Sequence, residues 1–304
     1  MAMFDARRVV WDGQGTDVRG ATDSETVMRL AGLDWDVIQK PIYTDTRLIE
    51  GFKANVRDFD EKFLGIVTDR YKVVQNREAF SFTDALIGEG VSYETAGSFS
   101  GDKKIWLLAK LDRCKLAGDD FDPYLVFFNT HDGSGSIRVA ITPIRVICQN
   151  MLNLAMKSSS RIVSFVHKGD IESKLDEARY TLSHTKEYLA ALDEELGTLQ
   201  SKSLTDARVK EYVEELLPLK ENETSKVHRR NIEEMRKDLL YRYFFAPDLV
   251  DVNKSAYRFI NAVSDFATHT DIHKETKHYD ENLFDKSANG NPFIDKAYEL
   301  VKAA

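Results

Sequence analysis

Cysteine is scarce in this sequence, and long apolar runs are missing. The 304 residues include two cysteines, Cys114 and Cys148, which lie far apart and form no CxxC pair. Two isolated cysteines cannot hold a structural metal alone, and a chain of this length needs no disulfide scaffold. No apolar stretch approaches the ~20 residues that a membrane-spanning helix requires. We therefore expect no disulfide framework, no cysteine metal site and no membrane partner.

The amino-terminal residues lack the apolar segment of a signal peptide, because polar and glycine residues follow the basic pair Arg7-Arg8. The chain is therefore expected to stay in the cytoplasm of the cell that makes it. Residues 1–22 are polar and glycine-rich, and we expect them to be loosely ordered.

Phosphate-binding and nucleophile motifs are also missing. Neither GxxxxGK[ST] nor GxGxxG occurs. The nearest sequence, His131–Ser136, lies between two strand-like runs, so no helix amino terminus is available there to bind phosphate. Ser134 has glycine on both sides, but a nucleophile elbow joins a strand to a helix, which this segment does not. The sequence therefore favours a non-catalytic protein without a cofactor, although it does not settle the question.

Charge of one sign is in moderate excess. The chain has 42 Lys and Arg against 50 Asp and Glu, a net charge of −8. This balance argues against a surface that binds polyanions everywhere, because phosphate contacts require clustered cations. A local basic strip remains compatible with it.

The first half of the chain carries the pattern of an antiparallel sheet. Within residues 124–156, two apolar runs flank a Gly/Ser turn, and a polar segment leads into a helix expected to start near Gln149. Short apolar runs separated by Gly/Asp turns at ~10-residue spacing are typical of antiparallel strands. The expected strands cover residues 35–43, 63–68, 71–74, 91–99, 104–111, 124–129, 137–141 and 144–147, and the expected helices cover 23–31 and 77–87. The sequence thus predicts an α+β domain over residues 23–168.

Residues 169–304 are predicted to be helical, because glycine becomes rare and charge density rises. Apolar side chains recur there in alternating steps of four and three, which is a heptad pattern. Such a seam either packs on the chain's own helices or forms a coiled coil between copies, and both interpretations stay open. Further helices are expected at about 205–217, 224–245, 253–267 and 291–302. The predicted homo-oligomer interface comprises Ile171, Leu175, Leu182, Leu189, Leu192, Leu196 and Leu199.

Basic, amide and aromatic side chains of the sheet domain could form a binding face. Cations that track a phosphate backbone and rings that stack on bases are typical of proteins that bind single-stranded nucleic acid. The alternative is an ordinary solvated sheet face. The candidate nucleic-acid-binding residues are Arg70, Tyr71, Lys72, Arg77, Tyr93, Lys103, Lys104, Arg138, Arg145, Gln149 and Asn150.

A metal site is a weaker candidate. His131 and Asp132 are adjacent in the predicted turn, and Asp119, Asp120 and Asp122 precede them by a few residues. A histidine beside an aspartate can act as a general base or a metal ligand. Acidic loop residues more often only face water, so no metal is assigned.

Four segments resemble one known family over nearly the whole chain. They are LGIVTDRYKVVQNREAF (64–80), YETAGSFSGDKKIWLLAKL (93–111), NTHDGSGSIRVAITPIRVICQN (129–150) and AYRFINAVSDFATH (256–269). Their residue sequences are similar to those of the phage/plasmid-like protein family, catalogued as domain of unknown function number nine hundred and thirty-two. The resemblance implies a phage, prophage or plasmid gene whose product acts in a bacterial cytoplasm, and it implies no catalytic residues.

The order helix, strand meander, helix over residues 77–156 is also similar to the core of phage single-strand annealing proteins, which is an analogy of fold. We therefore expect an accessory protein of phage or plasmid replication and recombination that binds single-stranded nucleic acid. The alternative is an oligomeric protein-binding module that inhibits or sequesters a host factor, such as a component of anti-phage defence.

Overall fold

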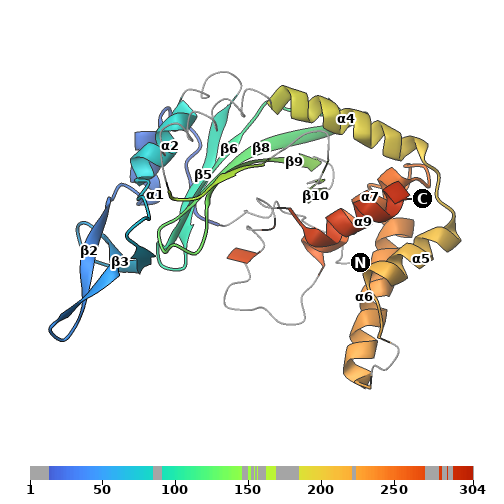
Figure 1. Cartoon of the computed structure of the whole chain (residues 1–304). Coiled ribbons are helices and arrows are strands. Elements are labelled where there is room, and N and C mark those ends of the chain that lie inside the picture. The colour runs from blue at the N-terminus through green and yellow to red at the C-terminus, as the bar shows by residue number, and fades with distance from the viewer. Residues whose placement is uncertain are drawn as a thin grey trace.

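A computed structural model describes residues 14–84, 91–145, 150–151, 154, 156, 162–168, 185–220, 224–270, 281–282, 286 and 290–303. The chain has an α+β fold, with antiparallel sheets in its first half and helices in its second half (Figure 1). The predicted fold class is confirmed at this level. No helix in the described ranges is long and apolar enough to cross a membrane.

The larger sheet forms the centre of the fold. Within the described residues it has eight strands in the order β1-β5-β6-β8-β9-β10, with β7 beside β8 and β11 beside β9. All of these neighbours pair antiparallel. The strands are β1 (Thr16–Asp17), β5 (Ser92–Phe99), β6 (Lys104–Lys110), β7 (Cys114–Leu116), β8 (Asp119–Thr130), β9 (Ile137–Arg145), β10 (Asn150–Met151) and β11 (Ile162–Phe165).

A smaller sheet projects from one end of the larger one (Figure 1). As far as the structure describes it, this small sheet contains β2 (Val37–Thr44), β3 (Arg47–Arg57) and β4 (Phe63–Thr68) in that order. It contacts the turn after β8, where Asn55 Nδ2 donates to the His131 carbonyl at 2.7 Å. Gly65 lies against the same turn, and a Cβ there would come within 2.5 Å of Asp132 Cα. Glycine is therefore required where the two sheets meet.

Both faces of the larger sheet are covered. Ile105 and Leu107 of β6 point into the main core, while Trp106 and Leu108 point to the other face and pack with Phe128. A strand buried on both faces is expected to be apolar throughout rather than alternating. This explains the continuous apolar run in the centre of β6.

The helices that the structure describes pack on the main core side of this sheet or on one another. They are α1 (Ser24–Ala31), α2 (Asn76–Asp84), α4 (Thr185–Ser201), α5 (Asp206–Leu216), α6 (Lys226–Phe245), α7 (Ala256–His269) and α9 (Pro292–Ala303). The central one is α7, which packs against α4, α6 and α9 and next to β10. Phe127 of β8 and Val263 of α7 belong to the same buried cluster. The predicted division at residue 168 stays a prediction, because a cluster shared by both halves does not locate a boundary.

Most predicted helices are confirmed. The Asp23 side chain accepts a hydrogen bond from the Thr26 backbone N–H at 2.7 Å and caps α1, which Gly32 ends with a left-handed φ of 66°. The four later predictions correspond to α5, α6, α7 and α9. Caps and helical periodicity were therefore sufficient to place them.

Two local predictions were wrong. The helix expected near Gln149 is absent at Asn150 and Met151, which instead pair with β9 as the short strand β10. Pairing with an exposed strand edge satisfies their backbone groups without a helix. Residues 71–74 are not a strand, since the Tyr71 N–H closes a turn onto the Thr68 carbonyl at 2.9 Å.

The described part of the heptad seam is covered by the chain itself. Leu192, Leu196 and Leu199 of α4 are buried, and Leu189 packs against the same core. A second copy cannot reach these side chains while α4 is in place. The predicted interface residues Ile171, Leu175 and Leu182 lie outside the described residues. The heptad itself stays a prediction.

Candidate functional site

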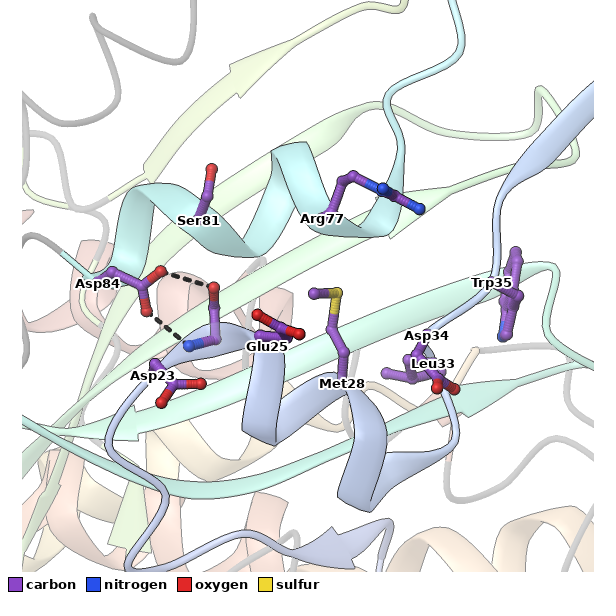
Figure 2. A pocket seen from close by; sticks show the side chains of 10 residues that line it. Asp23, Glu25, Met28, Leu33, Asp34, Trp35, Arg77, Ser81 and Asp84 are labelled. Carbon is purple, nitrogen blue, oxygen red and sulfur yellow. Dashed lines mark hydrogen bonds between the residues drawn. The ribbon is translucent and has the colours of Figure 1, made fainter.

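A pocket of about 480 Å³ lies between α1 and α2 (Figure 2). At one end the Asp84 carboxylate accepts hydrogen bonds from the Ser24 backbone N–H at 2.6 Å and from the Ser24 hydroxyl at 2.7 Å. These bonds join the amino terminus of α1 to the carboxyl terminus of α2. The lining residues are Asp23, Ser24, Glu25, Met28, Leu33, Asp34, Trp35, Arg77, Ser81 and Asp84.

Carboxylates dominate the charge of this pocket. Its cationic lining residue, Arg77, is paired with Asp36 at 2.8 Å, so its charge is already balanced. Hydrogen bonding from Thr26 lowers the pKa of Asp23 and keeps that carboxyl ionised. Such a pocket suits an ammonium or guanidinium group and repels phosphate. Arg77, predicted to bind nucleic acid, therefore lies in an acidic setting.

The two tyrosines predicted to stack on bases are buried. Tyr71 is 8% exposed and its hydroxyl donates to the Thr130 carbonyl at 2.6 Å. Tyr93 is 1% exposed and its hydroxyl donates to Asp84 at 2.9 Å. Burial raises the pKa of both phenols. Neither ring is open to a ligand, because both point toward the core rather than to a surface.

Arg145 also lies inside the protein. Its side chain is 2% exposed and pairs with Asp119 at 2.7 Å and with Asp248 at 3.0 Å. Arg145 ends β9 on the side of the sheet that faces the main core. Its charge therefore joins the sheet to the turn after α6 and is not presented to a ligand.

Three further predicted cations, Lys103, Lys104 and Arg138, are half-buried. Lys104 forms an ion pair with Glu281. Lys103 places its Nζ 5.7 Å from the centre of the Phe63 ring. Arg138 Nε donates to the Ser136 hydroxyl at 3.0 Å. Gln149 lies outside the described residues, as does the side chain of Asn150.

Three exposed cations meet where β11 ends, and sequence reasoning missed one of them. The Lys72 N–H donates to the His167 carbonyl at 2.8 Å, which brings Lys168 beside Lys72 and Arg70. The His167 ring stacks on Tyr71 with 4.4 Å between centres. No local pattern marked Lys168, because the pairing joins segments that are distant in the sequence.

Arg138 extends this group along the sheet. It lies opposite Ser164 in the register of β9 and β11, and the hydroxyls of Ser136 and Ser164 are 2.8 Å apart. Lys168 is four positions after Ser164, a span of at most ~14 Å for an extended chain. We call Arg70, Lys72, Arg138 and Lys168 the basic edge.

His131 and Asp132 do not form the metal site considered from the sequence. His131 is buried, and its Nε2 lies 2.9 Å from Asn76 Oδ1. Asp132 accepts from the Ser134 N–H at 2.9 Å, as an Asx turn does. Within the described part of the chain, no three His, Cys, Asp or Glu side chains are grouped to hold a metal ion. These two residues therefore have structural partners here.

The small sheet has an exposed apolar face that sequence reasoning also missed. Val56 lies opposite Ile38 on one side and Phe63 on the other, and Ala54 lies opposite Ile66. Partners in register share a face, as do alternate residues such as Phe52, Ala54 and Val56. We call Ile38, Phe52, Phe63 and Ile66 the apolar face; they are 38%, 47%, 51% and 55% exposed. Alternation along β3 was the signal that could have found it.

Comparison with known proteins identifies the family. A family model described as Domain of unknown function (DUF932) matches residues 63–288, well over half of the chain. The chain belongs to the DUF932 family. The match begins at β4 and ends before α9, and it includes Phe63 and Ile66 of the apolar face and the whole basic edge. No curated protein and no solved structure matches this DUF932 protein.

Proposed function

We propose that this DUF932 protein is a non-catalytic accessory protein that binds single-stranded nucleic acid along the basic edge during phage or plasmid replication and recombination. The observation that supports the proposal is the pairing of Lys72 with His167, which brings Arg70, Lys72 and Lys168 together as exposed cations. Clustered cations are what phosphate contacts require. The site is smaller than the one predicted from sequence.

The basic edge differs in charge from the rest of the predicted strip. Arg77, Lys104 and Arg145 each have a carboxylate partner. Arg70 and Lys72 are exposed and form no ion pair within the described part of the chain. Their charges are therefore available to a phosphate.

The form of the basic edge favours a single strand over a duplex. Its cations lie on a turn, a loop and strand ends, and not along a helix. A row of cations follows one backbone, whereas duplex readout places a helix or a β-ribbon in a groove. The hydroxyls of Ser136 and Ser164 add donors that could bind phosphate oxygens.

Fluorescence anisotropy with a labelled oligothymidylate tests the proposal. We expect binding at about 50 mM salt that weakens strongly by about 200 mM. The double variant Arg70→Ala/Lys72→Ala should bind more weakly, and its salt slope should fall by about 1.4, which is two contacts at ~0.7 each. The control Lys210→Ala/Lys226→Ala removes two exposed cations from α5 and α6 and alters net charge equally.

Two outcomes would overturn this proposal. Absence of binding by the wild type at low salt would remove nucleic acid as the ligand. An equal loss in the control variant would show that net charge, and not the basic edge, governs binding.

The alternative function, a module that binds and inhibits a host protein, draws its support from the apolar face of the small sheet. Solvent-exposed apolar patches on a sheet are typical of protein interfaces. A pull-down from host lysate with the chain as bait tests this alternative, and recovery of nothing beyond the bait would count against it.

A further inference from the structure

We propose that the apolar face of the small sheet is a stacking platform for the bases of the strand whose phosphates contact the basic edge. This inference rests on the proposed function and deepens it, because it assigns the contacts that the bases make. The basic edge consists of cations with two neighbouring hydroxyls, and such groups bind phosphate without holding a base.

Phe52 and Phe63 place two aromatic rings on the apolar face, and each side chain is about half exposed. Val56 is the register partner of Phe63 and lies four positions from Phe52, so the two phenylalanines are about 13 Å apart along the strand direction. Ile66 is exposed and lies between them, opposite Ala54. The apolar face therefore offers two rings with an apolar surface between them.

Both rings lie on the outward side of the small sheet. Asn55, which precedes Val56 on β3, donates to the His131 carbonyl at 2.7 Å, and Gly65 on the next strand lies against Asp132. Successive side chains of a strand point to opposite faces, so the face opposite to these contacts is turned outward. The small sheet also projects from the larger one (Figure 1). A flexible strand of nucleic acid can therefore reach both rings.

A cation lies at each end of the apolar face. Lys103 Nζ is 5.7 Å from the centre of the Phe63 ring, and this ammonium group forms no ion pair with any residue that the structure describes. At the other end, Thr68 is the register partner of Phe52. Arg70 follows Thr68 by two positions, a span of at most ~7 Å. The chain therefore leads from the apolar face directly into the basic edge.

This combination of rings and cations favours a single strand over a protein partner. Bases of any sequence stack on aromatic rings, while the phosphates between them require nearby cations. The centre of a protein interface is depleted of lysine, whereas Lys103 lies over the Phe63 ring itself. Lys40 is also on this face, opposite Ala54, but Glu61 balances its charge. We therefore assign phosphate contacts to Lys103 and the basic edge and not to Lys40.

The experiment compares two labelled strands of equal length by fluorescence anisotropy at low salt. One is an oligothymidylate, and the other has the same backbone with abasic sugars. Both carry the same number of phosphates, so they differ only in their bases. A stacked base contributes at least about a fivefold gain in affinity, so two rings should give the full-length wild type a preference of at least about 25-fold for the oligothymidylate.

The variant Phe52→Leu/Phe63→Leu keeps the surface apolar but removes both rings. It should bind both strands with the affinity that the wild type has for the abasic strand. Its salt slope should be unchanged, since no phosphate contact is removed. Phe52→Trp/Phe63→Trp should retain the preference, because tryptophan also stacks on bases. The matched control Phe245→Leu removes a ring of α6 that is 64% exposed and lies outside the apolar face, and it should bind as the wild type does.

The outcomes distinguish a failure of this inference from a failure of the proposed function. Binding of neither strand by the wild type would overturn both. Equal affinity of the wild type for the two strands would leave the basic edge as the site and overturn the stacking, and the apolar face would then be assigned to a protein partner. A leucine variant that keeps the preference, or that loses affinity for both strands equally, would also overturn the stacking. So would an equal loss in Phe245→Leu.

Discussion

The ring of His131 is hydrogen-bonded to Asn76 inside the core, with 2.9 Å between His131 Nε2 and Asn76 Oδ1. Asn76 Nδ2 donates to the carbonyls of Leu33 at 2.8 Å and Trp35 at 3.3 Å, so Oδ1 is the acceptor in the bond to histidine. Nε2 therefore carries the proton. His131 Nδ1 is buried and has no hydrogen-bond partner in the described structure. A second proton would place an unsatisfied charge in the core.

Acidification should destabilise the fold through this ring. Burial, followed by the charge of His167, lowers the pKa of His131 from 6.5 to about 3. Because the folded pKa is the lower one, the unfolded chain takes up the proton first, and stability present above about pH 6.5 is lost as the pH falls toward about 3. Inside this window the free energy of unfolding should fall by ~1.4 kcal/mol per pH unit from this group. Urea unfolding at a series of pH values measures the slope.

The variant His131→Gln isolates this contribution, because glutamine does not titrate. Its unfolding free energy should depend less steeply on pH than that of the wild type. A wild-type slope in His131→Gln would show that other groups govern the acid response.

Removing Arg145 should destabilise the protein by ~3–5 kcal/mol, because it leaves a buried carboxylate without its cation. Asp248, whose side chain is 6% exposed, would lose the partner that lies 3.0 Å away. Arg113→Ala is the matched control: Arg113 pairs with Asp122 at 2.7 Å but is 53% exposed, so its loss should cost ~0–1 kcal/mol. Denaturant unfolding of the two variants measures the difference. Equal decreases in the free energy of unfolding would mean that burial does not strengthen the contribution of the Arg145 ion pairs to stability.

Strand alternation along β9 predicts which face of the sheet each of its side chains lies on. It placed Arg138 on one face and Val139 and Ile141 on the other, and the structure agrees. Continued to Arg145, the same alternation puts that arginine on the core side. We expected a break at Pro143, but β9 runs through it, with Pro143 opposite Pro123. Pairing the two residues that lack an N–H donor allows the strand to continue.

Other features depend on contacts that no local pattern reveals. The basic edge exists because Lys72 pairs with His167, and the burial of Tyr71 depends on the Thr130 carbonyl. Both contacts join segments far apart in the sequence. The burial of Tyr93 is harder to predict from the sequence, because an irregularity between Tyr93 and Thr95 shifts the register of β5. A one-residue shift moves side chains to the opposite face.

Gly15 should tolerate alanine poorly. Its φ is +68°, and a Cβ there would lie 2.6 Å from both the Ala96 carbonyl oxygen and the Trp106 ring. Gly32 is the matched control, with φ +66° and nothing within 4 Å of its Cβ position. Both substitutions incur the left-handed backbone cost of ~1–2 kcal/mol, and Gly15→Ala should add ~1–3 kcal/mol for overpacking. Urea unfolding of the two variants measures the difference. Equal decreases in the free energy of unfolding would mean that the Trp106 side chain can shift to make room for the methyl group at no energetic cost.

Leu196→Ala should separate the two interpretations of the heptad seam. Leu196 is fully buried within one copy of the chain, so the substitution leaves a cavity and should lower the free energy of unfolding by ~2–5 kcal/mol. Glu194→Ala changes an exposed residue of the same helix and should alter stability by less than ~0.5 kcal/mol. Neither substitution should alter the molar mass of the protein in solution, because α4 packs on α7 and β7 of its own chain. A fall in molar mass for folded Leu196→Ala, without a comparable fall for Glu194→Ala, would place the seam in a subunit interface.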